Sequence, residues 1–169
     1  MKFDIGRDLI KILAISTMTI DHIGRIIYPE IIFLQIIGRL AFPLFAYLVA
    51  IGLKSTKKPI KYILTFLIFG LISQIPYSLA FNIQPFERLN IFFSLFLGAL
   101  TIYFFKKKSF IIIAPIILSV VFNTEGSFYV VLTILFMNLL LEDKKIGVLA
   151  LFALNLPFLF VESLVFLIY

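Results

Sequence analysis

The sequence contains no cysteine, only one histidine and few charged residues. The absence of cysteine excludes disulfides, thiolate zinc sites, iron–sulfur clusters and cysteine nucleophiles. The single histidine, His22, excludes a metal site built from several imidazoles, and we expect no metal. Charged side chains make up 14% of the 169 residues, whereas a soluble domain carries roughly 25% because its surface faces water. The composition therefore argues against a soluble fold.

Apolar residues fill the remainder, at 62% of the chain with a mean hydropathy of +1.14. We expect an all-α fold, a polytopic bundle of transmembrane helices in the cell membrane, with the lipid bilayer as its main partner. The whole chain, 1–169, is interpreted as one transmembrane domain. The net charge of +6 is expected to report topology, and we expect no nucleic acid partner. The N-terminus lacks a signal-peptide pattern, so the first apolar segment should be retained as a helix.

Seven segments are candidates for a membrane span, which needs about 20 apolar residues. They are 8–28, 31–53, 60–80, 89–105, 109–123, 126–141 and 146–168. The fifth and sixth are short, and they could form either a hairpin or one interrupted segment. All eleven lysines lie at the N-terminus or in the second, fourth and sixth connections. This distribution favours the hairpin and predicts a cytoplasmic N-terminus.

Polar residues other than lysine gather in the outer half of the expected bundle. His22 lies roughly 21 Å above the cytoplasmic start of the first span, and Arg39 roughly 12 Å below the outer start of the second. The two levels nearly coincide, which predicts a polar site inside the bundle. Further polar residues expected in this layer are Gln74, Asn90, Asn123, Glu125 and Glu162, and the arginines Arg25 and Arg88 are expected inside a span or on the outer side.

Helix geometry suggests how the first span arranges its charges. Asp21 and Arg25 are four residues apart and therefore share a face, whereas Asp21 and His22 point about 100° apart. Asp21 is thus better placed to pair with Arg25 than to orient His22. A carboxylate partner for His22 would come from Glu125 or Glu162. An ion pair of purely structural importance is the alternative interpretation of Asp21 and Arg25.

The other polar residues also have two interpretations. For Arg39, the preceding Gly38 allows close helix approach and Pro43 breaks the helix one turn on, which favours a functional role. Gln74 and Asn90 are candidate substrate-binding residues, as are Arg25 and Glu125. Gln74 could instead satisfy the backbone at a Pro76 kink, and Asn90 could instead be a helix N-cap. In the basic loop, Lys54, Lys57 and Lys58 would mark orientation, contact anionic lipid, or bind the phosphates of a cofactor.

Four blocks of the chain resemble the TraX family. Residues 15–24 read ISTMTIDHIG, residues 37–47 read IGRLAFPLFAY, residues 71–77 read LISQIPY and residues 90–95 read NIFFSL. The chain departs from the pattern common in relatives at Gln74, where glutamate is frequent, at Ala50-Ile51-Gly52, where a glutamate often precedes the glycine, and near Thr65, where an arginine is expected.

The resemblance implies a membrane acyltransferase. It implies that cytoplasmic acetyl-CoA donates an acetyl group to an extracytoplasmic amine or hydroxyl, such as a pilin-like peptide N-terminus or a sugar. It gives His22 the catalytic role, as general base or acetyl carrier, with Asp21 and Arg39 beside it. Two other functions remain open from the residues alone. The buried polar layer would also suit a small transporter or channel, and the chain could be a non-catalytic assembly subunit.

Overall fold

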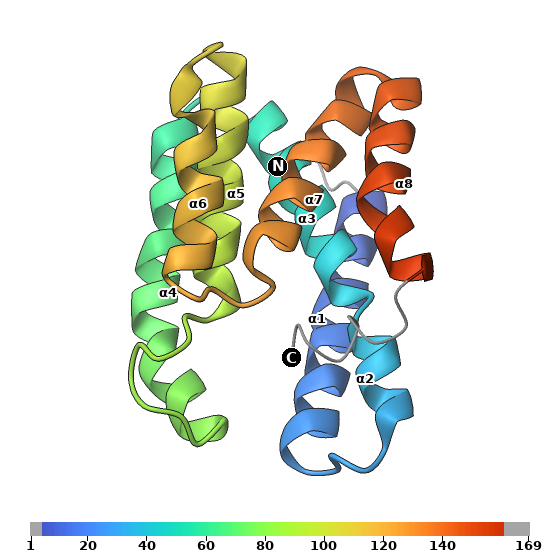
Figure 1. Ribbon diagram of the computed structural model, residues 1–169, viewed down its shortest axis with the longest axis vertical. Coiled ribbons are helices and arrows are strands. Elements are labelled where there is room, and N and C mark those ends of the chain that lie inside the picture. The colour runs from blue at the N-terminus through green and yellow to red at the C-terminus, as the bar shows by residue number, and fades with distance from the viewer. Residues whose placement is uncertain (1–4, 161–169) are drawn as a thin grey trace.

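A computed structural model describes residues 5–160, most of which are helical (Figure 1). Eight α-helices and one short 3-10 helix, η1, follow one another along these residues. In chain order they are α1 (Ile5–Ile26), α2 (Ile32–Gly38), α3 (Ala41–Ser55), α4 (Pro59–Ala80), α5 (Ile91–Lys106), η1 (Phe110–Ile112), α6 (Ile113–Val121), α7 (Ser127–Glu142) and α8 (Lys144–Phe160). One isolated β-bridge joins Leu89 to Thr124.

Each predicted apolar segment is matched by helix, so the all-α prediction is confirmed. The fifth and sixth segments form separate helices, η1 with α6 and then α7, which run in opposite directions (Figure 1). The hairpin interpretation is therefore correct for this part of the chain. The seventh segment is helical through residue 160, and its remainder, with Glu162, lies outside the described residues.

The second segment is broken into α2 and α3 at Arg39 and Leu40. Pro43, in the first turn of α3, has no amide hydrogen to give to the carbonyl four residues earlier, which is that of Arg39. A hydrogen bond of the kind found in turns, between residues three apart, closes the end of α2 instead. It runs from the Leu40 N–H to the Ile37 carbonyl at 3.1 Å. The predicted helix break is confirmed, and it lies one turn before the proline.

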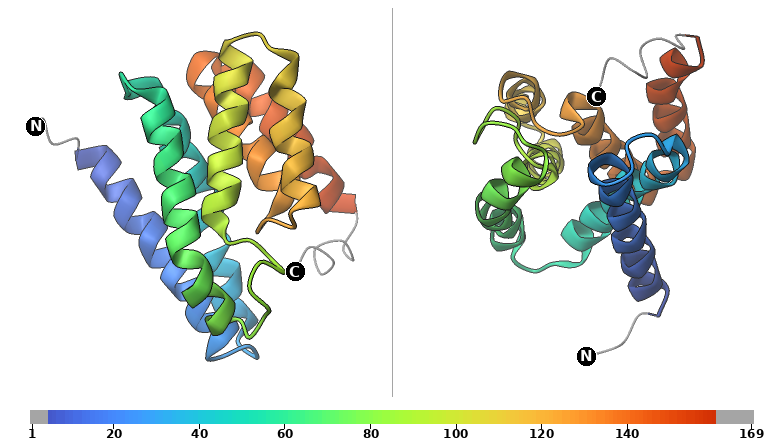
Figure 2. Two further views of the ribbon diagram at one scale, coloured as in Figure 1. Left: turned by 90° about the vertical axis from the view of Figure 1, so that its left-hand side faces the viewer. Right: turned by 90° about the horizontal axis from the view of Figure 1, so that it is seen from below.

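Successive segments alternate in direction (Figure 1). As a result, the lysine-bearing connections after α3, α5 and α7 lie at one end of the molecule, together with the start of α1. The connections 27–31 and 81–90 lie at the other end, whereas the 122–126 connection between α6 and α7 lies nearer the middle of the molecule. We call these two ends of the molecule the lysine end and the opposite end. Figure 2 shows from further sides that α1 is tilted relative to α5.

The buried core lies between α3, α5 and α7, with a contribution from α4. Helix α7 packs against α3, α5, α6 and α8, so it is central in the molecule. Close approach of α5 and α7 depends on Gly98, where an added Cβ would collide with Ile134. The buried apolar residues of this core are Ala46, Val49, Ala50, Leu53, Ile63, Leu95, Ala99, Ile102, Val130, Ile134 and Leu135.

The outer faces of the helices are strongly apolar. Ile72 on α4, Val121 on α6 and Leu149 on α8 are 66%, 68% and 66% exposed. Two helical segments, Ile32–Ser55 and Pro59–Ala80, are long and apolar enough to cross a membrane, and only 33% and 22% of their apolar windows are buried. The core helix of a soluble protein would be mostly buried. The exposed apolar faces therefore indicate a membrane protein.

Candidate functional site

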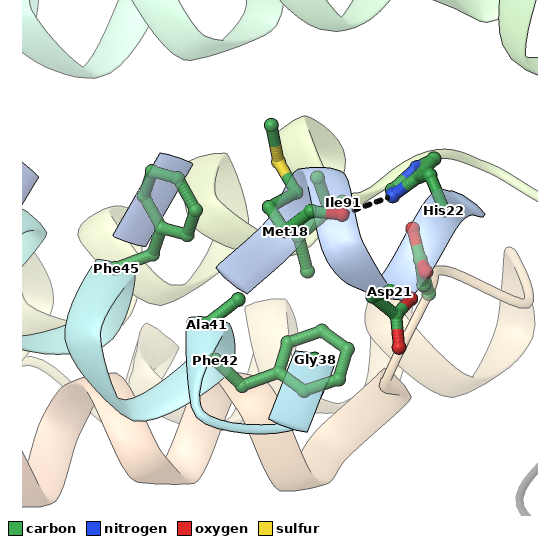
Figure 3. Close-up of a pocket in the computed structure, with 9 residues that line it drawn as sticks. Met18, Asp21, His22, Gly38, Ala41, Phe42, Phe45 and Ile91 are labelled. Carbon is green, nitrogen blue, oxygen red and sulfur yellow. Dashed lines mark hydrogen bonds between the residues drawn. The ribbon is translucent and has the colours of Figure 1, made fainter. Parts of the chain in front are cut away.

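A small cavity lies where α1, α3, α5 and the 122–126 connection meet (Figure 3). Its volume is about 20 Å³, which is room for about one water molecule. Its polar side chains are Asp21, His22 and Glu125, and its remaining walls are apolar or glycine. The full lining is Met18, Asp21, His22, Gly38, Ala41, Phe42, Phe45, Ile91 and Glu125.

His22 projects from α1, half-buried, with its ring against the edge of Phe81 at 5.6 Å between ring centroids. Its Nδ1 lies 2.9 Å from the carbonyl oxygen of Met18, one helical turn earlier (Figure 3). A carbonyl can only accept, so Nδ1 must carry the hydrogen in this contact. In neutral imidazole the lone pair is then on Nε2, which is the nitrogen that can accept a proton.

Asp21 lies on the same helix but forms a different contact. Its Oδ2 accepts a hydrogen bond from Nε of Arg25 at 2.7 Å, and the two side chains are 8% and 14% exposed. The prediction that Asp21 pairs with Arg25 is confirmed. Because the Met18 carbonyl holds the Nδ1 side of His22, Asp21 is not the group that orients the imidazole.

Glycine brings α1 and α2 together at this level. A Cβ on Gly38 would collide with the Cα, Cβ and Oδ1 atoms of Asp21, and a Cβ on Gly24 would lie 2.8 Å from the Cβ of Leu34. The Oδ1 of Asp21 is buried and has no hydrogen-bond partner among the described residues. The predicted role of Gly38 in close helix approach is confirmed. This close approach explains why the Oδ1 of Asp21 is buried from solvent.

Glu125 is 4% exposed, although it lies in a connection between helices. Its N–H donates to the Leu89 carbonyl at 2.8 Å, and its own carbonyl accepts from the Ser94 hydroxyl at 2.6 Å. Burial raises the pKa of the Glu125 carboxyl above its ordinary value, and the nearby charges of Arg88, His22 and Arg25 oppose that shift. Of the carboxylates proposed as partners of His22, Glu125 shares its cavity, whereas Glu162 lies outside the described residues.

Gln74 and Asn90 do not line the cavity but bind each other. The Gln74 Oε1 accepts from the Asn90 side chain at 2.9 Å and from its backbone N–H at 3.0 Å. The Gln74 amide donates to the Arg88 carbonyl at 2.9 Å, and the Asn90 amide donates to the Gly70 carbonyl at 2.8 Å. Asn90 also caps α5 by accepting from the Phe92 N–H at 3.0 Å.

These bonds use nearly all the hydrogen-bonding capacity of the two amides, which are 0% and 3% exposed. The N-cap interpretation of Asn90 is therefore confirmed. Gln74 joins α4 to the 81–90 connection, so its bonds are not those of a side chain relieving the Pro76 kink. Substrate binding by either residue stays a prediction that the geometry does not favour.

Arg39 ends α2 and is exposed, and it is not among the residues that line the cavity. Helix α2 therefore contributes Gly38 to the cavity lining, whereas Arg39 is not part of that lining. His22 and Arg39 were expected at one depth, but only His22 lines the cavity.

The basic loop divides into two parts at the lysine end. Lys54 donates a 2.8 Å hydrogen bond to the Leu141 carbonyl, near the last turn of α7. Lys57, Lys58 and Lys61 instead line an open concavity of about 390 Å³. A neighbouring concavity of about 310 Å³ includes Lys106 and Lys107, and Thr56 borders both. Lys57, Lys58 and Lys61 are available for an anionic ligand, whereas Lys54 has a structural bond and Lys106 pairs with Glu142 at 3.8 Å.

Some important contacts were not among the sequence-based candidates. Ser94 and Thr124 are buried and hydrogen-bonded to each other at 2.8 Å, which ties α5 to the connection that carries Glu125. Phe81, directly after α4, packs against the His22 ring. Within residues 5–160, no group of three or more acidic or imidazole side chains is arranged to hold a metal ion.

Comparison with known proteins gives one family and one relative. The model of the TraX protein family matches residues 6–168. The uncharacterized protein RP591 of Rickettsia prowazekii (strain Madrid E) is 40% identical over 102 residues, which is 60% of this chain and 38% of that protein. The chain thus matches little more than a third of that relative's length. No solved structure matches. Because the family match covers nearly the whole sequence, the chain belongs to the TraX protein family.

Proposed function

We propose that this protein is a multi-pass membrane acyltransferase that moves an acetyl group from cytoplasmic acetyl-CoA to an amine or hydroxyl at the extracytoplasmic side. The observation that carries the proposal is the contact between His22 Nδ1 and the Met18 carbonyl at 2.9 Å. It leaves Nε2 as the proton-accepting atom of a half-buried imidazole in a small, mostly apolar cavity.

The membrane topology of the proposal follows from the two ends of the molecule. The lysine-bearing connections lie together, and by the positive-inside rule that end faces the cytoplasm. The helices between the ends expose apolar side chains to their surroundings, as a lipid-facing surface requires. The opposite end, with the 27–31 and 81–90 connections, then faces away from the cytoplasm.

His22 can serve the reaction in two ways. As a general base, Nε2 takes the proton of the acceptor while the acceptor's nitrogen or oxygen attacks the thioester carbonyl, and the imidazolium returns that proton to the leaving thiolate. As a carrier, Nε2 attacks the carbonyl itself, releases the thiolate and holds the acetyl group until the acceptor takes it. Glu125 is the neighbouring carboxyl that can stabilise the imidazolium in either route.

The donor would reach His22 from the lysine end. Lys57, Lys58 and Lys61 form a basic concavity suited to the phosphates of acetyl-CoA. Helix α3 runs from this end to the cavity, and the 12 positions between Lys54 and Phe42 correspond to about 18 Å of helix. Because the cavity holds about one water, the helices must separate for the thioester to enter.

The proposal is tested with the purified full-length protein, radiolabelled acetyl-CoA and a panel of amine and sugar acceptors. His22→Gln preserves an N–H that can reach the Met18 carbonyl but removes the base, so we expect transfer to fall by about 10²- to 10⁴-fold. Thr17→Ala is the matched control, because Thr17 lies on the same helix with its hydroxyl bonded to the Leu13 carbonyl. Absence of a labelled product with every acceptor would refute the enzyme.

The same variants separate this proposal from its alternatives. A transporter or channel would show a liposome flux that His22→Gln abolishes, without acyl transfer. A non-catalytic assembly subunit would keep its cellular phenotype in His22→Gln. Because the cavity of about 20 Å³ has room for about one water molecule, a transported solute would require the helices to separate, as the thioester does.

A further inference from the structure

Arg88 lies in the 81–90 connection at the opposite end of the molecule, and its backbone is held on both sides. Its carbonyl accepts a 2.9 Å hydrogen bond from Gln74. The next residue, Leu89, bridges to Thr124 and accepts from the Glu125 N–H at 2.8 Å. Glu87, on the other side, accepts from the Asn123 side chain at 3.1 Å. A residue fixed in this way presents its side chain from a defined place.

The guanidinium of Arg88 is half-buried and, across the part of the chain that the structure describes, has neither a hydrogen bond nor an ion pair. Arginine stays charged in any protein environment and carries a planar fork of donors that fits carboxylate and phosphate groups. A partly desolvated guanidinium with unused donors is costly unless an anion or water meets it. The position is therefore suited to an anion from outside the chain.

Arg88 belongs to the surroundings of the cavity. It interacts electrostatically with Glu125, which lines the cavity, and so do His22, Arg25 and Asp21 from α1. The Tyr77 hydroxyl on α4 is in electrostatic range of Glu125, Arg88 and Arg25. Arg25 is paired with Asp21, whereas Arg88 has no carboxylate of the described residues within ion-pair distance.

We propose that Arg88 binds an anionic group of the acyl acceptor, so that the acceptor is a molecule with a phosphate or carboxylate close to its reactive amine or hydroxyl. This inference rests on the proposed function, because it specifies the acceptor of that reaction. The anion anchors the acceptor at the extracytoplasmic side and leaves its nucleophile to reach His22. A phospholipid headgroup has the same chemistry and is the competing source of the anion.

Binding is measured on the full-length protein in detergent without acetyl-CoA, by equilibrium dialysis of labelled probes. The probes are two pairs that share an amine: glucosamine 6-phosphate with glucosamine, and the C-terminal amide of alanyl-aspartate with the C-terminal amide of alanyl-asparagine. We expect the anionic member of at least one pair to bind roughly tenfold more tightly, as one charge-assisted contact allows. Arg88→Gln should abolish this preference and Arg88→Lys should retain part of it. Lys145→Gln removes an exposed charge at the lysine end and should change nothing.

Equal binding within both pairs, or a preference that survives in Arg88→Gln, would overturn the inference. If the glutamine variant fails to fold, as judged by thermal unfolding, the lysine variant decides by the same comparison. An Arg88-dependent retention of phosphatidylglycerol, with no Arg88-dependent binding of either anionic probe, would assign the site to lipid and also overturn it. Acetyl transfer is assayed separately, so a preference for anions without transfer would refute the enzyme and leave the anion site standing.

Discussion

The Nε of Arg25 donates a 2.7 Å hydrogen bond to the Oδ2 of Asp21. Asp21 therefore pairs with Arg25 and does not orient the imidazole of His22. His22 is held instead by the Met18 carbonyl. In the usual arrangement a carboxylate orients a catalytic imidazole through Nδ1, but here a backbone carbonyl occupies that position. Besides Asp21, the cavity is lined by the carboxyl group of Glu125, which comes from a connection about 100 residues later in the chain.

The contact of Gly38 with Asp21 predicts that Gly38→Ala is destabilising. The added Cβ would overlap backbone and side-chain atoms of Asp21, which cannot be relieved by rotating a flexible side chain. We expect a loss of about 1–3 kcal/mol, with a displaced α1 and reduced acetyl transfer. Thermal unfolding in detergent measures the effect. Gly70→Ala is the control, since its Cβ would come no closer than 3.2 Å to the Phe93 ring; equal stability of both variants would contradict the packing described for Gly38.

Replacing Asn90, which is hydrogen-bonded to Gln74, is also expected to lower the stability of the protein. Asn90→Ala removes the cap of α5, so the Phe92 N–H loses its acceptor, and the Gly70 carbonyl and the Gln74 Oε1 each lose one donor. The expected cost is about 2–4 kcal/mol, from the lost cap and the lost hydrogen bonds. The exposed Gln84, in the preceding connection, provides the control Gln84→Ala. If the two variants unfold at the same temperature, these hydrogen bonds contribute nothing.

The burial of the Glu125 carboxyl leads us to expect that the stability of the protein depends on pH. Burial raises the pKa of this carboxyl in the folded protein above its ordinary value of 4.5, against the opposing charges of Arg88, His22 and Arg25. The unfolded chain therefore loses this proton at lower pH than the folded chain does. The contribution of protonated Glu125 to stability is complete below about pH 4.5 and is lost as pH rises through the folded-state pKa.

Glu125→Gln removes this group from the titration. The variant should show a flatter dependence of unfolding temperature on pH above 4.5 than the parent protein. Glu30→Gln, at an exposed position in the 27–31 connection, should retain the parent's dependence. Identical pH profiles for the parent and Glu125→Gln would show that the carboxyl is not buried as described.

The proposed topology can be tested directly because the chain has no cysteine. A single cysteine in Lys57→Cys should react with a membrane-impermeant maleimide only from the cytoplasmic side. A single cysteine in Gln84→Cys should react only from the opposite side, since 81–90 lies at the other end. Right-side-out and inverted vesicles give the two readings. Labelling of both positions from the same side would contradict the multi-pass arrangement.

The helices and the Asp21–Arg25 pair could be predicted because each depends on local spacing. A run of apolar residues predicts a helix, and a separation of four residues places two side chains on one face. The hairpin of α6 and α7 was predictable from the lysines, since charge records which connections share an end.

Contacts between distant segments could not be predicted in this way. The bond between Gln74 and Asn90 joins residues 16 positions apart through a turn of unknown shape. Arg39 was expected beside His22 because the two residues lie at similar depths. Depth along a helix, however, does not give the direction in which a side chain points. The glutamine at 74 is understandable only in the folded protein, where its amide donates to the Arg88 carbonyl, a bond that an ionised glutamate could not make.

Acetyl transfer across a membrane is the decisive measurement for the proposed reaction. Full-length protein is reconstituted into liposomes with radiolabelled acetyl-CoA at the lysine end and the acceptor on the other side, and the labelled product is counted on the acceptor side. The account predicts His22-dependent product there, with no leak of acetyl-CoA, and a loss of about 10²-fold or more in His22→Gln. Equal product from the parent and His22→Gln, or no product from either, would contradict it.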